Sequence, residues 1–387
     1  MLRKNLLDSE TRLPLGSIDQ KVYLLDLTSE QLKKFVVDLG DKPYRQTQLI
    51  NWVFRKGETD FFNMTDISSD SLKNYMRVST AAPKVKPLET QTDPDGTVKI
   101  LWELNDGLTI ESVLIDEDTH VTMCLSTQVG CRMGCRFCRT GLIGFKRQMT
   151  QGEILSQVIE GRRLINKTKS LTNLVFMGMG EPLDNHANTL SSINYLTGTN
   201  MMGFSQRRVT LSTVGVIPEL EKLISQTNRL DCSLTISMGS AIDSVRSQLM
   251  PINRQFPLKD LRKVLERYTP AQRGRRITFA YVLLEGVNDS QQQALALVKF
   301  LSGLKAKVNL IPFNPWPEAP FKRPSNEAIL NFQNVLLSHN LTAIIRRTNG
   351  QEVNAACGLL TGRHLKNQES STALYPLTTA QTKSLAS

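Results

Sequence analysis

From residue 120 onward, short apolar segments alternate with amphipathic ones. Apolar runs stand at VTMCLS, NLVFMG, RVTLST, CSLTIS, ITFAYVLL, VNLIPF and TAIIRR, and helical patterns such as GEILSQVIEGRRLI and SQQQALALVKFLSGL lie between them. Apolar runs of this length are typical of strands that are buried on both faces of a parallel sheet. The alternation therefore predicts an α/β fold, a partial (β/α)6 barrel, over residues 120–350.

The preceding residues show two other patterns. LTSEQLKKFVVDLG and the segment after Pro43 predict two helices, with Ser29 as the N-cap of the first and Gly40 as its stop, and a third helix is expected near 69–78. The runs TVKILWEL and LTIESVLID alternate, and the NDG between them indicates a hairpin.

These patterns divide the chain into six parts. They are a flexible arm (1–22), a small N-terminal helical accessory domain that could face RNA (23–85), a β-hairpin extension (86–119), the barrel core (120–350), a loop around Cys357 (351–364) and a polar tail expected to be disordered (365–387).

The charge balance favours a polyanionic partner. The 387 residues carry a formal net charge of +11, and basic residues cluster at 162–169, 207–208, 273–276 and 346–347. Phosphate backbones attract such proteins whatever their sequence. No apolar run approaches the ~20 residues of a membrane span, and the N-terminus lacks the apolar core of a secretory signal. We therefore expect a cytoplasmic protein that binds no membrane.

Half of the six cysteines form a C-x-x-x-C-x-x-C motif at Cys131, Cys135 and Cys138. Three thiolates can hold three corners of a 4Fe-4S cluster, and because full protein ligation needs four, one iron would stay open to a ligand. Zinc sites usually combine a close pair with a second, distant pair, which is missing here. Disulfides are rare in the cytosol. The spacing favours a cluster, with zinc or structural thiols as alternatives.

Other polar groups follow the predicted strands at the same relative place. The run GMGEP comes directly after one strand; its Gly180 lets the backbone approach a ligand closely, and its Glu181 can accept from a ligand ammonium or ribose. Ser212, Ser237 and Asn314 stand at the ends of three further strands. Parallel barrels carry functional groups at the carboxyl ends of their strands. We therefore expect one shared site, in which an open iron could bind S-adenosylmethionine for radical chemistry.

Cys232, in DCSLTI, is assigned to the core, whereas the other two thiols and one acid allow two interpretations each. Cys124 near a strand end and Cys357 in NAACGLLTG are either structural thiols or nucleophiles and redox partners. Glu111, on an alternating strand, is either an outward surface acid or an inward base.

The stretches ESVLI…CLSTQVGCRMGCRFC, FMGMGEPLDN, RVTLSTVGV, SQLMPIN, IPFNPW and NAACGLLTG occur in a specific order and spacing. Between residues 25 and 363 the chain resembles the radical S-adenosylmethionine RNA methyltransferases of the RlmN/Cfr group. The resemblance implies a radical SAM core, a 4Fe-4S cluster on the three motif cysteines and two S-adenosylmethionine molecules per turnover. It implies cofactor contacts from Gly180, Glu181, Ser212, Ser237, Met238, Gly239 and Asn314. Gly239 departs from the family, which often has His there.

The resemblance also implies a reaction path. Cys357 is first methylated by an ordinary displacement, and an adenosyl radical then takes a hydrogen from the methyl thioether. The carbon radical adds to an adenine ring carbon, which crosslinks protein and RNA. Cys124 matches the thiol that resolves this adduct by forming a disulfide with Cys357, and Glu111 matches the proton acceptor.

Within the group, Pro182 followed by Leu-Asp-Asn resembles the RlmN branch, because Cfr-like chains tend to have Ala at the Pro182 position. This resemblance implies methylation of adenine C2 in 23S rRNA, in the peptidyl-transferase region, and in tRNA next to the anticodon. It also implies a flavodoxin-type electron donor and a monomer. The alternatives are a Cfr-type C8 methyltransferase that confers antibiotic resistance and a non-catalytic iron–sulfur protein that binds RNA or senses redox state.

Overall fold

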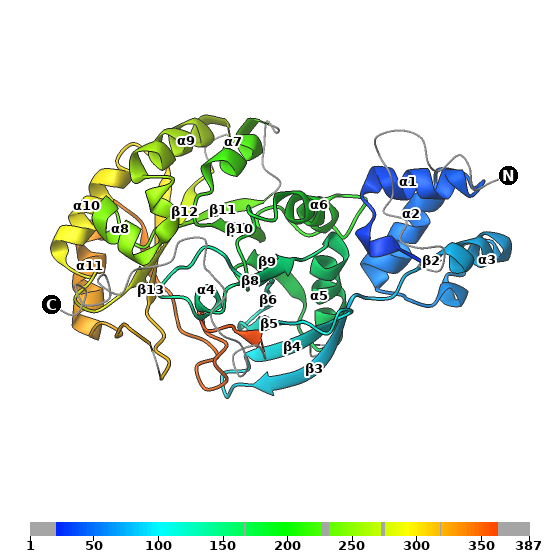
Figure 1. The fold of residues 1–387 in the computed structure, drawn as a ribbon, viewed down its shortest axis with the longest axis horizontal. Helices are drawn as coiled ribbons and strands as arrows, with labels where there is room; N and C mark the ends of the chain where they lie inside the picture. The colour runs from blue at the N-terminus through cyan, green and yellow to red at the C-terminus, as the bar shows by residue number, and fades with distance from the viewer. Residues whose placement is uncertain (1–20, 166–167, 226–231, 272–274, 318, 363–387) are drawn as a thin grey trace.

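The computed structural model describes residues 21–165, 168–225, 232–271, 275–317 and 319–362. Nearly all of the predicted flexible arm and the whole of the predicted disordered tail lie outside the described residues. The described chain forms a group of N-terminal helices beside a larger α/β body (Figure 1). Within these ranges, no helix combines the length and apolarity needed to cross a membrane.

The α/β body is built on one ten-stranded sheet with the order β14-β13-β12-β11-β10-β9-β6-β5-β4-β3. In this order, neighbouring strands pair in parallel all the way from β14 to β6. Their bounds are β6 (Val121–Cys124), β9 (Leu171–Phe176), β10 (Val209–Thr213), β11 (Ser233–Ser237), β12 (Ile277–Leu283), β13 (Ala306–Pro312) and β14 (Ala343–Ile345). The predicted α/β barrel class is confirmed, with short β14 as a seventh parallel strand.

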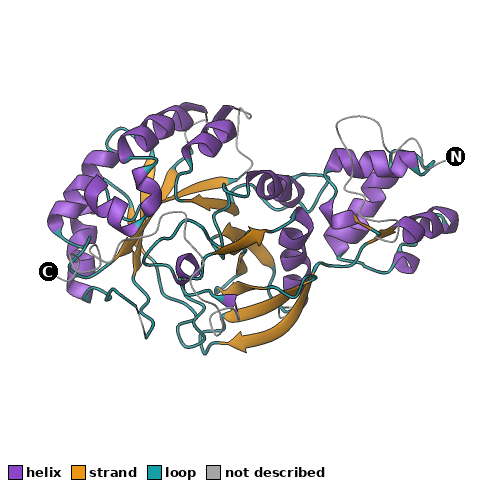
Figure 2. Cartoon of the chain, in the orientation of Figure 1, coloured by secondary structure: helices purple, strands orange, loops and turns teal. Residues whose placement is uncertain are grey.

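Helices follow most of these strands. They are α4 (Arg139–Leu142), α5 (Gln151–Arg163), α6 (His186–Thr197), α7 (Ile217–Ser225), α8 (Asp243–Leu249), α9 (Leu258–Ala271), α10 (Gln291–Leu301) and α11 (Asn326–Ser338). The longer helices lie along the convex side of the curved sheet, whereas α4 and the red C-terminal segment lie within its curve (Figures 1 and 2). Helices on one side leave the other side of the barrel available for loops.

The β-hairpin extension continues the same sheet. The predicted hairpin is present as β4 (Val98–Leu104) and β5 (Thr109–Asp116), which pair antiparallel. β5 also pairs antiparallel with β6, so the extension is joined directly to the barrel. An outer strand, β3 (Val85–Thr92), pairs with β4. Its exposed, polar sequence with a proline is typical of an edge strand, which is why alternation did not reveal it.

The N-terminal helices are α1 (Ser29–Asp38), α2 (Arg45–Leu49), which runs on as a π-helical segment over Ile50–Lys56, and α3 (Ser69–Val78), with the short strands β1 (Val22–Tyr23) and β2 (Ser79–Thr80). The predicted third helix is confirmed. The predicted N-cap Ser29 is wrong. The cap is Thr28, because its hydroxyl accepts from the Gln31 amide while the Gln31 side chain accepts from the Thr28 amide.

The N-terminal helices pack firmly against α5 and α6 of the barrel. Phe54 stacks on Tyr195 of α6 with ring centroids 4.4 Å apart, and the Tyr195 hydroxyl donates to the Leu27 carbonyl at 2.9 Å. Asp26 pairs with Lys84 at 2.6 Å and accepts from the Gly152 amide of α5 at 3.0 Å. A stacked aromatic pair and a half-buried ion pair hold the two parts in a defined orientation.

A two-stranded ladder sets the position of the triple-cysteine loop, residues 131–138. β7 (Gln128–Gly130) pairs antiparallel with β8 (Phe145–Gln148), so both ends of the segment are joined. Gly130 has a φ of +77°, and a Cβ there would lie 1.9 Å from the Gly144 carbonyl oxygen. That same oxygen accepts from the Cys131 amide at 2.8 Å. Only glycine permits this close approach of the two backbones.

We predict that Gly130→Ala destabilises the protein by about 3 kcal/mol or more, because the methyl group adds a backbone clash to left-handed strain. Gly107→Ala is the matched control: its φ is +79°, and nothing lies within 4 Å of its would-be Cβ. Strain alone should cost about 1 kcal/mol there. Thermal unfolding of the two variants measures the difference, and equal destabilisation would contradict this account of the ladder.

Candidate active site

One cavity opens at the carboxyl ends of the parallel strands and gathers most of the candidate residues. Its lining includes nine that sequence analysis singled out: Cys131, Cys135, Cys138, Gly180, Glu181, Ser212, Ser237, Asn314 and Cys357. They come from the segments that follow or end β6, β9, β10, β11 and β13, and from the C-terminal loop. The structure therefore brings together groups that are up to 226 positions apart, since 357 − 131 = 226.

The triple-cysteine loop presents its thiols to this cavity. Burial is the main cause that raises the pKa of Cys131, Cys135 and Cys138, and neighbouring thiols add to it in each case. The loop is fixed by its own backbone, since the Cys138 amide donates to the Cys135 carbonyl at 3.1 Å. Buried thiols that disfavour ionisation by themselves become thiolates when a metal binds them.

The three motif cysteines are suited to an iron–sulfur cluster. A cubane takes each cysteine at a different iron, so three thiols can hold it and leave the fourth iron open to a ligand. Cys131, Cys135 and Cys138 share one cavity wall without a fourth cysteine beside them in sequence, which suits three-point attachment.

The glycine-rich run after β9 supplies a buried acid. A Cβ on Gly180 would lie 2.5 Å from the Gln128 side chain, so the backbone passes here without a side chain. The Glu181 carboxylate accepts from the Val214 amide at 2.9 Å and the Leu183 amide at 3.0 Å. Burial nevertheless raises the pKa of Glu181 to about 7. A positively charged ligand group would stabilise its ionised form.

Asn314 provides a second acceptor in the cavity wall. Its Nδ2 donates to the Cys357 carbonyl at 3.3 Å, whereas its buried Oδ1 has no hydrogen-bond partner among the described residues. A buried polar atom without a partner is costly, and a ligand hydrogen can satisfy it. The cavity thus offers a buried carboxylate at Glu181 and a free amide oxygen, which suit the ammonium and adenosine groups of S-adenosylmethionine.

The two separate thiols have contrasting environments. Cys357 is exposed in a loop and lines the cavity. Cys124 ends β6, is buried and does not line the cavity. Burial raises the pKa of Cys124, and the nearby Cys357 raises it further. Cys232, by contrast, is fully buried in the core, as predicted.

Three further candidates lie outside the cavity lining. Met238 is fully buried. Gly239 has a φ of +65°, and a Cβ there would lie 2.6 Å from the sulfur of Met250. A side chain at this position would require Met250 to move and would take a left-handed backbone conformation. Glu111 is buried, and its carboxylate binds backbone amides rather than facing the cavity. The cofactor and proton-acceptor roles of these residues stay predictions.

Sequence reasoning missed Arg246 of α8, which is 1% exposed. Its guanidinium donates to the Val214 carbonyl at 2.7 Å, the Met238 carbonyl at 3.0 Å and Asn253 Oδ1 at 2.7 Å. Burial lowers the pKa of Arg246 to about 10. Arg246 ties the segments after β10 and β11 together at the cavity wall. Its sequence neighbourhood is an ordinary helix, so no local signal distinguished it.

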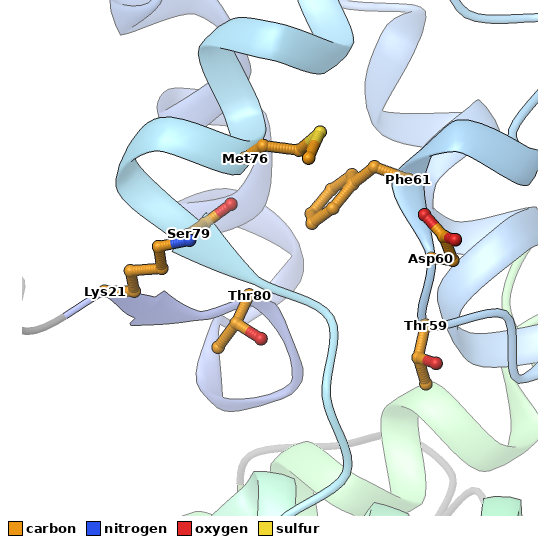
Figure 3. A pocket seen from close by; sticks show the side chains of 7 residues that line it. All are labelled: Lys21, Thr59, Asp60, Phe61, Met76, Ser79 and Thr80. Carbon is orange, nitrogen blue, oxygen red and sulfur yellow. The ribbon is translucent and has the colours of Figure 1, made fainter.

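A second hollow, of about 320 Å³, lies in the N-terminal helices. Its lining consists of Lys21, Thr59, Asp60, Phe61, Met76, Ser79 and Thr80. Phe61 and Met76 lie side by side at one part of it (Figure 3). Although this hollow exceeds the roughly 160 Å³ of the barrel cavity, it contains none of the cysteines and is open to solvent. The barrel cavity is therefore the candidate active site.

Two family descriptions match the chain. "Ribosomal RNA large subunit methyltransferase N-terminal domain" matches residues 22–79, and "Radical SAM superfamily" matches residues 125–298. The matched ranges coincide with the N-terminal helices and with most of the parallel sheet.

Curated relatives cover nearly the whole chain. A protein of Syntrophus aciditrophicus named "Dual-specificity RNA methyltransferase RlmN" is 40% identical over 348 residues, which are 90% of this chain and 99% of the relative. A protein of the same name from Syntrophobacter fumaroxidans is 39% identical over 89% of this chain and 99% of its own length.

A solved structure agrees with these relatives. The crystal structure of a radical SAM methyltransferase from Sphaerobacter thermophilus superimposes with a TM-score of 0.82 at 37% identity, covering 89% of this chain and 99% of that one. Sequence and fold agree over the full extent of these relatives, and the chain belongs to the RlmN family of radical SAM RNA methyltransferases.

Proposed function

We propose that the protein methylates adenine C2 in RNA through a methylated Cys357. The observation that carries this proposal is that an exposed thiol, Cys357, lines the same cavity as Cys131, Cys135 and Cys138, while a second thiol, Cys124, is buried at the carboxyl end of β6. A radical enzyme that acts on a small molecule needs the three motif cysteines but no such pair of additional thiols.

Bound in this cavity, a 4Fe-4S cluster and two S-adenosylmethionine molecules per turnover would supply the methyl group and the radical that abstracts a hydrogen from it. Cys131, Cys135 and Cys138 would hold the cluster. The backbone at Gly180 lets the ligand approach, and Glu181 accepts from its ammonium group. Ser212, Ser237 and Asn314 orient the remaining polar groups. Met238 and Gly239 do not line the cavity, so they contribute to cofactor binding indirectly, through the residues that do.

Cys357 carries the methyl carbon to the base. Amidine carbons of adenine are electrophilic, so they accept a nucleophilic carbon radical far better than a methyl cation. Addition to the ring joins Cys357 to the RNA through the new methylene. An exposed loop position gives the thiol access to both the cofactor and a large substrate.

Cys124 then releases the product. Loss of the ring proton and of the unpaired electron, which the cluster would accept, first leaves a closed-shell thioether between Cys357 and the base. The Cys124 sulfur then attacks the Cys357 sulfur, so that the S–S bond forms and the C–S bond breaks. The carbon keeps the C–S electron pair and takes the thiol proton of Cys124, which completes the methyl group. Cellular thiols reduce the disulfide afterwards. Burial raises the pKa of Cys124, so this thiol stays protonated and does not compete with Cys357 for the first methyl group. Glu111 takes up the ring proton.

The RNA substrates and partners follow the same reasoning. The relatives are named dual-specificity RNA methyltransferases, and the net charge of +11 favours a phosphate backbone. We therefore infer that 23S rRNA and tRNA are the substrates, that the enzyme acts as a cytoplasmic monomer and that a flavodoxin-type protein supplies the electron. Pro182 resembles the RlmN branch in sequence, which favours C2 over C8 chemistry.

Cys357→Ala should reduce RNA methylation by at least about a hundredfold, since the methyl carrier is lost. Cluster absorbance and RNA binding should remain. Cys232→Ala is the control, because that thiol is buried in the core outside the cavity and its loss should leave methylation intact. Methyl transfer to RNA from labelled S-adenosylmethionine is the measurement. Full activity in Cys357→Ala would end the proposal.

Cys124→Ala should trap the adduct, because nothing then attacks the Cys357 sulfur. Protein purified from cells should carry covalently bound RNA that survives denaturation and is released by nuclease. The double variant Cys124→Ala, Cys357→Ala is the matched control and should carry none. RNA-free Cys124→Ala protein with normal product formation would exclude a resolving role.

The regiochemistry is testable in cells with and without the gene. Mass spectrometry and chromatography of digested 23S rRNA and tRNA should show the loss of 2-methyladenosine from both. Loss of 8-methyladenosine instead would indicate the Cfr-type reaction. No change in any methyladenosine, together with an intact cluster, would favour the redox-sensing alternative.

A further inference from the structure

The loop that carries Cys357, residues 350–362, is held at its first end by the turn that joins β3 to β4. Asp95 Oδ2 accepts from the Gly350 amide at 2.9 Å, and Asp93 Oδ2 accepts from the Glu352 amide at 2.9 Å. These residues are about 255 positions apart in sequence. Hydrogen bonds to a carboxylate are roughly twice as strong as those between neutral groups.

The turn and the loop also pack closely. Gly350 has a φ of +66°, and a Cβ there would lie 2.6 Å from the Ala355 side chain and 2.9 Å from the Thr97 methyl group. The loop backbone therefore lies directly on the turn between β3 and β4, at a distance that only glycine allows.

The other end of the loop is held by Glu111. One oxygen, Oε2, accepts from the Thr361 amide at 2.6 Å and from the Gly362 amide at 3.1 Å. The second oxygen, Oε1, lies 3.9 Å from the Lys99 ammonium. Glu111 faces Leu101 across the β4–β5 pair, several residues along from the turn. The loop is thus bound to the extension at both ends, by Asp93 and Asp95 at one end and by Glu111 at the other.

Between its two bound ends, the loop contacts helix α4, which directly follows the triple-cysteine loop. The Arg139 amide donates to the Gly358 carbonyl at 2.7 Å, and the Thr140 hydroxyl donates to the Leu360 carbonyl at 2.6 Å. Cys357 lies between the anchored ends and beside these contacts. Its place relative to the cavity therefore depends on both ends of the loop.

We propose that Asp93, Asp95 and Glu111 form a carboxylate clamp that positions the Cys357 loop for methyl transfer. The inference rests on the proposed function, because it gives the clamp a thiol to position. It assigns the β-hairpin extension a task in the reaction, and it gives Glu111 a positioning role that is separate from proton acceptance.

The hydrogen-bond pattern suggests substitutions that remove the contacts to the Cys357 loop without removing the contacts that stabilise the turn itself. Asp93 Oδ1 accepts from the Asp95 amide and Asp95 Oδ1 from the Thr97 amide, within the turn itself. Each aspartate thus uses one oxygen for the turn and the other for the loop. Asparagine keeps one acceptor oxygen and replaces the other with a donor. Asp93→Asn with Asp95→Asn should keep the hydrogen bonds within the turn. Each new NH₂ group would face a loop amide that is also a donor, so the hydrogen bonds to the loop should be lost.

Glu111 offers a complementary pair of variants. Both loop amides are bound by a single oxygen, so Glu111→Gln can keep these hydrogen bonds through its amide oxygen while losing the ability to accept a proton. Glu111→Ala loses both functions. The glutamine variant should keep Cys357 methylation and lose RNA product, whereas the alanine variant should lose both.

The experiment uses the full chain with its cluster reconstituted. Hydrogen–deuterium exchange over residues 350–362 reports the loop directly, and mass spectrometry of Cys357 after addition of S-adenosylmethionine reports the rate of its methylation. In the Asp93→Asn, Asp95→Asn variant we expect exchange at residues 350–352 to rise, and Cys357 methylation to slow, by about tenfold. Exposed Asp118→Asn, on the turn after β5, is the control and should match the wild type.

Equal exchange and equal Cys357 methylation in the double variant and the control would overturn the clamp. Equal loss in Glu111→Gln and Glu111→Ala would also overturn it, because the clamp requires the glutamine to hold the loop. If the double variant does not fold, each single aspartate variant is measured in the same way. The exchange result does not depend on RNA methylation, so a failure of the clamp is distinguishable from a failure of the proposed function.

Discussion

All parallel strands of a sheet end at the same edge, and this constraint determines where the active site can form. β6, β9, β10, β11 and β13 each end in or lead to a segment that carries a candidate residue, and the curvature of the sheet directs these segments into one cavity. The antiparallel extension adds a further consequence. Because β5 runs opposite to β6, the early part of β5, with Glu111, lies level with the segment that leaves β6.

Burial then separates the chemistry of thiols that lie close together. The three motif cysteines and Cys124 are in surroundings that disfavour a free thiolate, and burial is the leading cause for each. Cys357 is exposed. In the proposed function, a metal would stabilise the thiolates of the motif cysteines, whereas Cys124 would react only with another sulfur. Side chains of the same chemistry would then take different roles because their surroundings differ.

The sequence predicted the fold class and the parallel strands well, because buried parallel strands leave uninterrupted apolar runs and the motifs stand directly after them. The same reasoning predicted one site for eight candidate residues, and the family resemblance added Cys357. The structure gathers all nine in the cavity lining. Their roles rest on the proposed function.

What the sequence could not supply depends on contacts between distant segments. The direction of Glu111 is decided by amides 250 positions away, and Arg246 becomes significant only because two strand ends meet beside it. The N-cap was placed one residue late because Thr28 and Ser29 are both good caps, and only the reciprocal bond with Gln31 distinguishes them. Gly239 is similar: the sulfur of Met250, which a side chain there would have to displace, belongs to another part of the chain.

We propose that Cys131, Cys135 and Cys138 would hold a 4Fe-4S cluster and leave one iron free to bind S-adenosylmethionine. Mössbauer spectroscopy of the reconstituted protein, with and without S-adenosylmethionine, tests it most directly. The account predicts a 4Fe-4S cluster in which one iron of four changes its isomer shift when the ligand binds. A protein that binds no cluster, or a cluster whose four irons are all indifferent to S-adenosylmethionine, would contradict it.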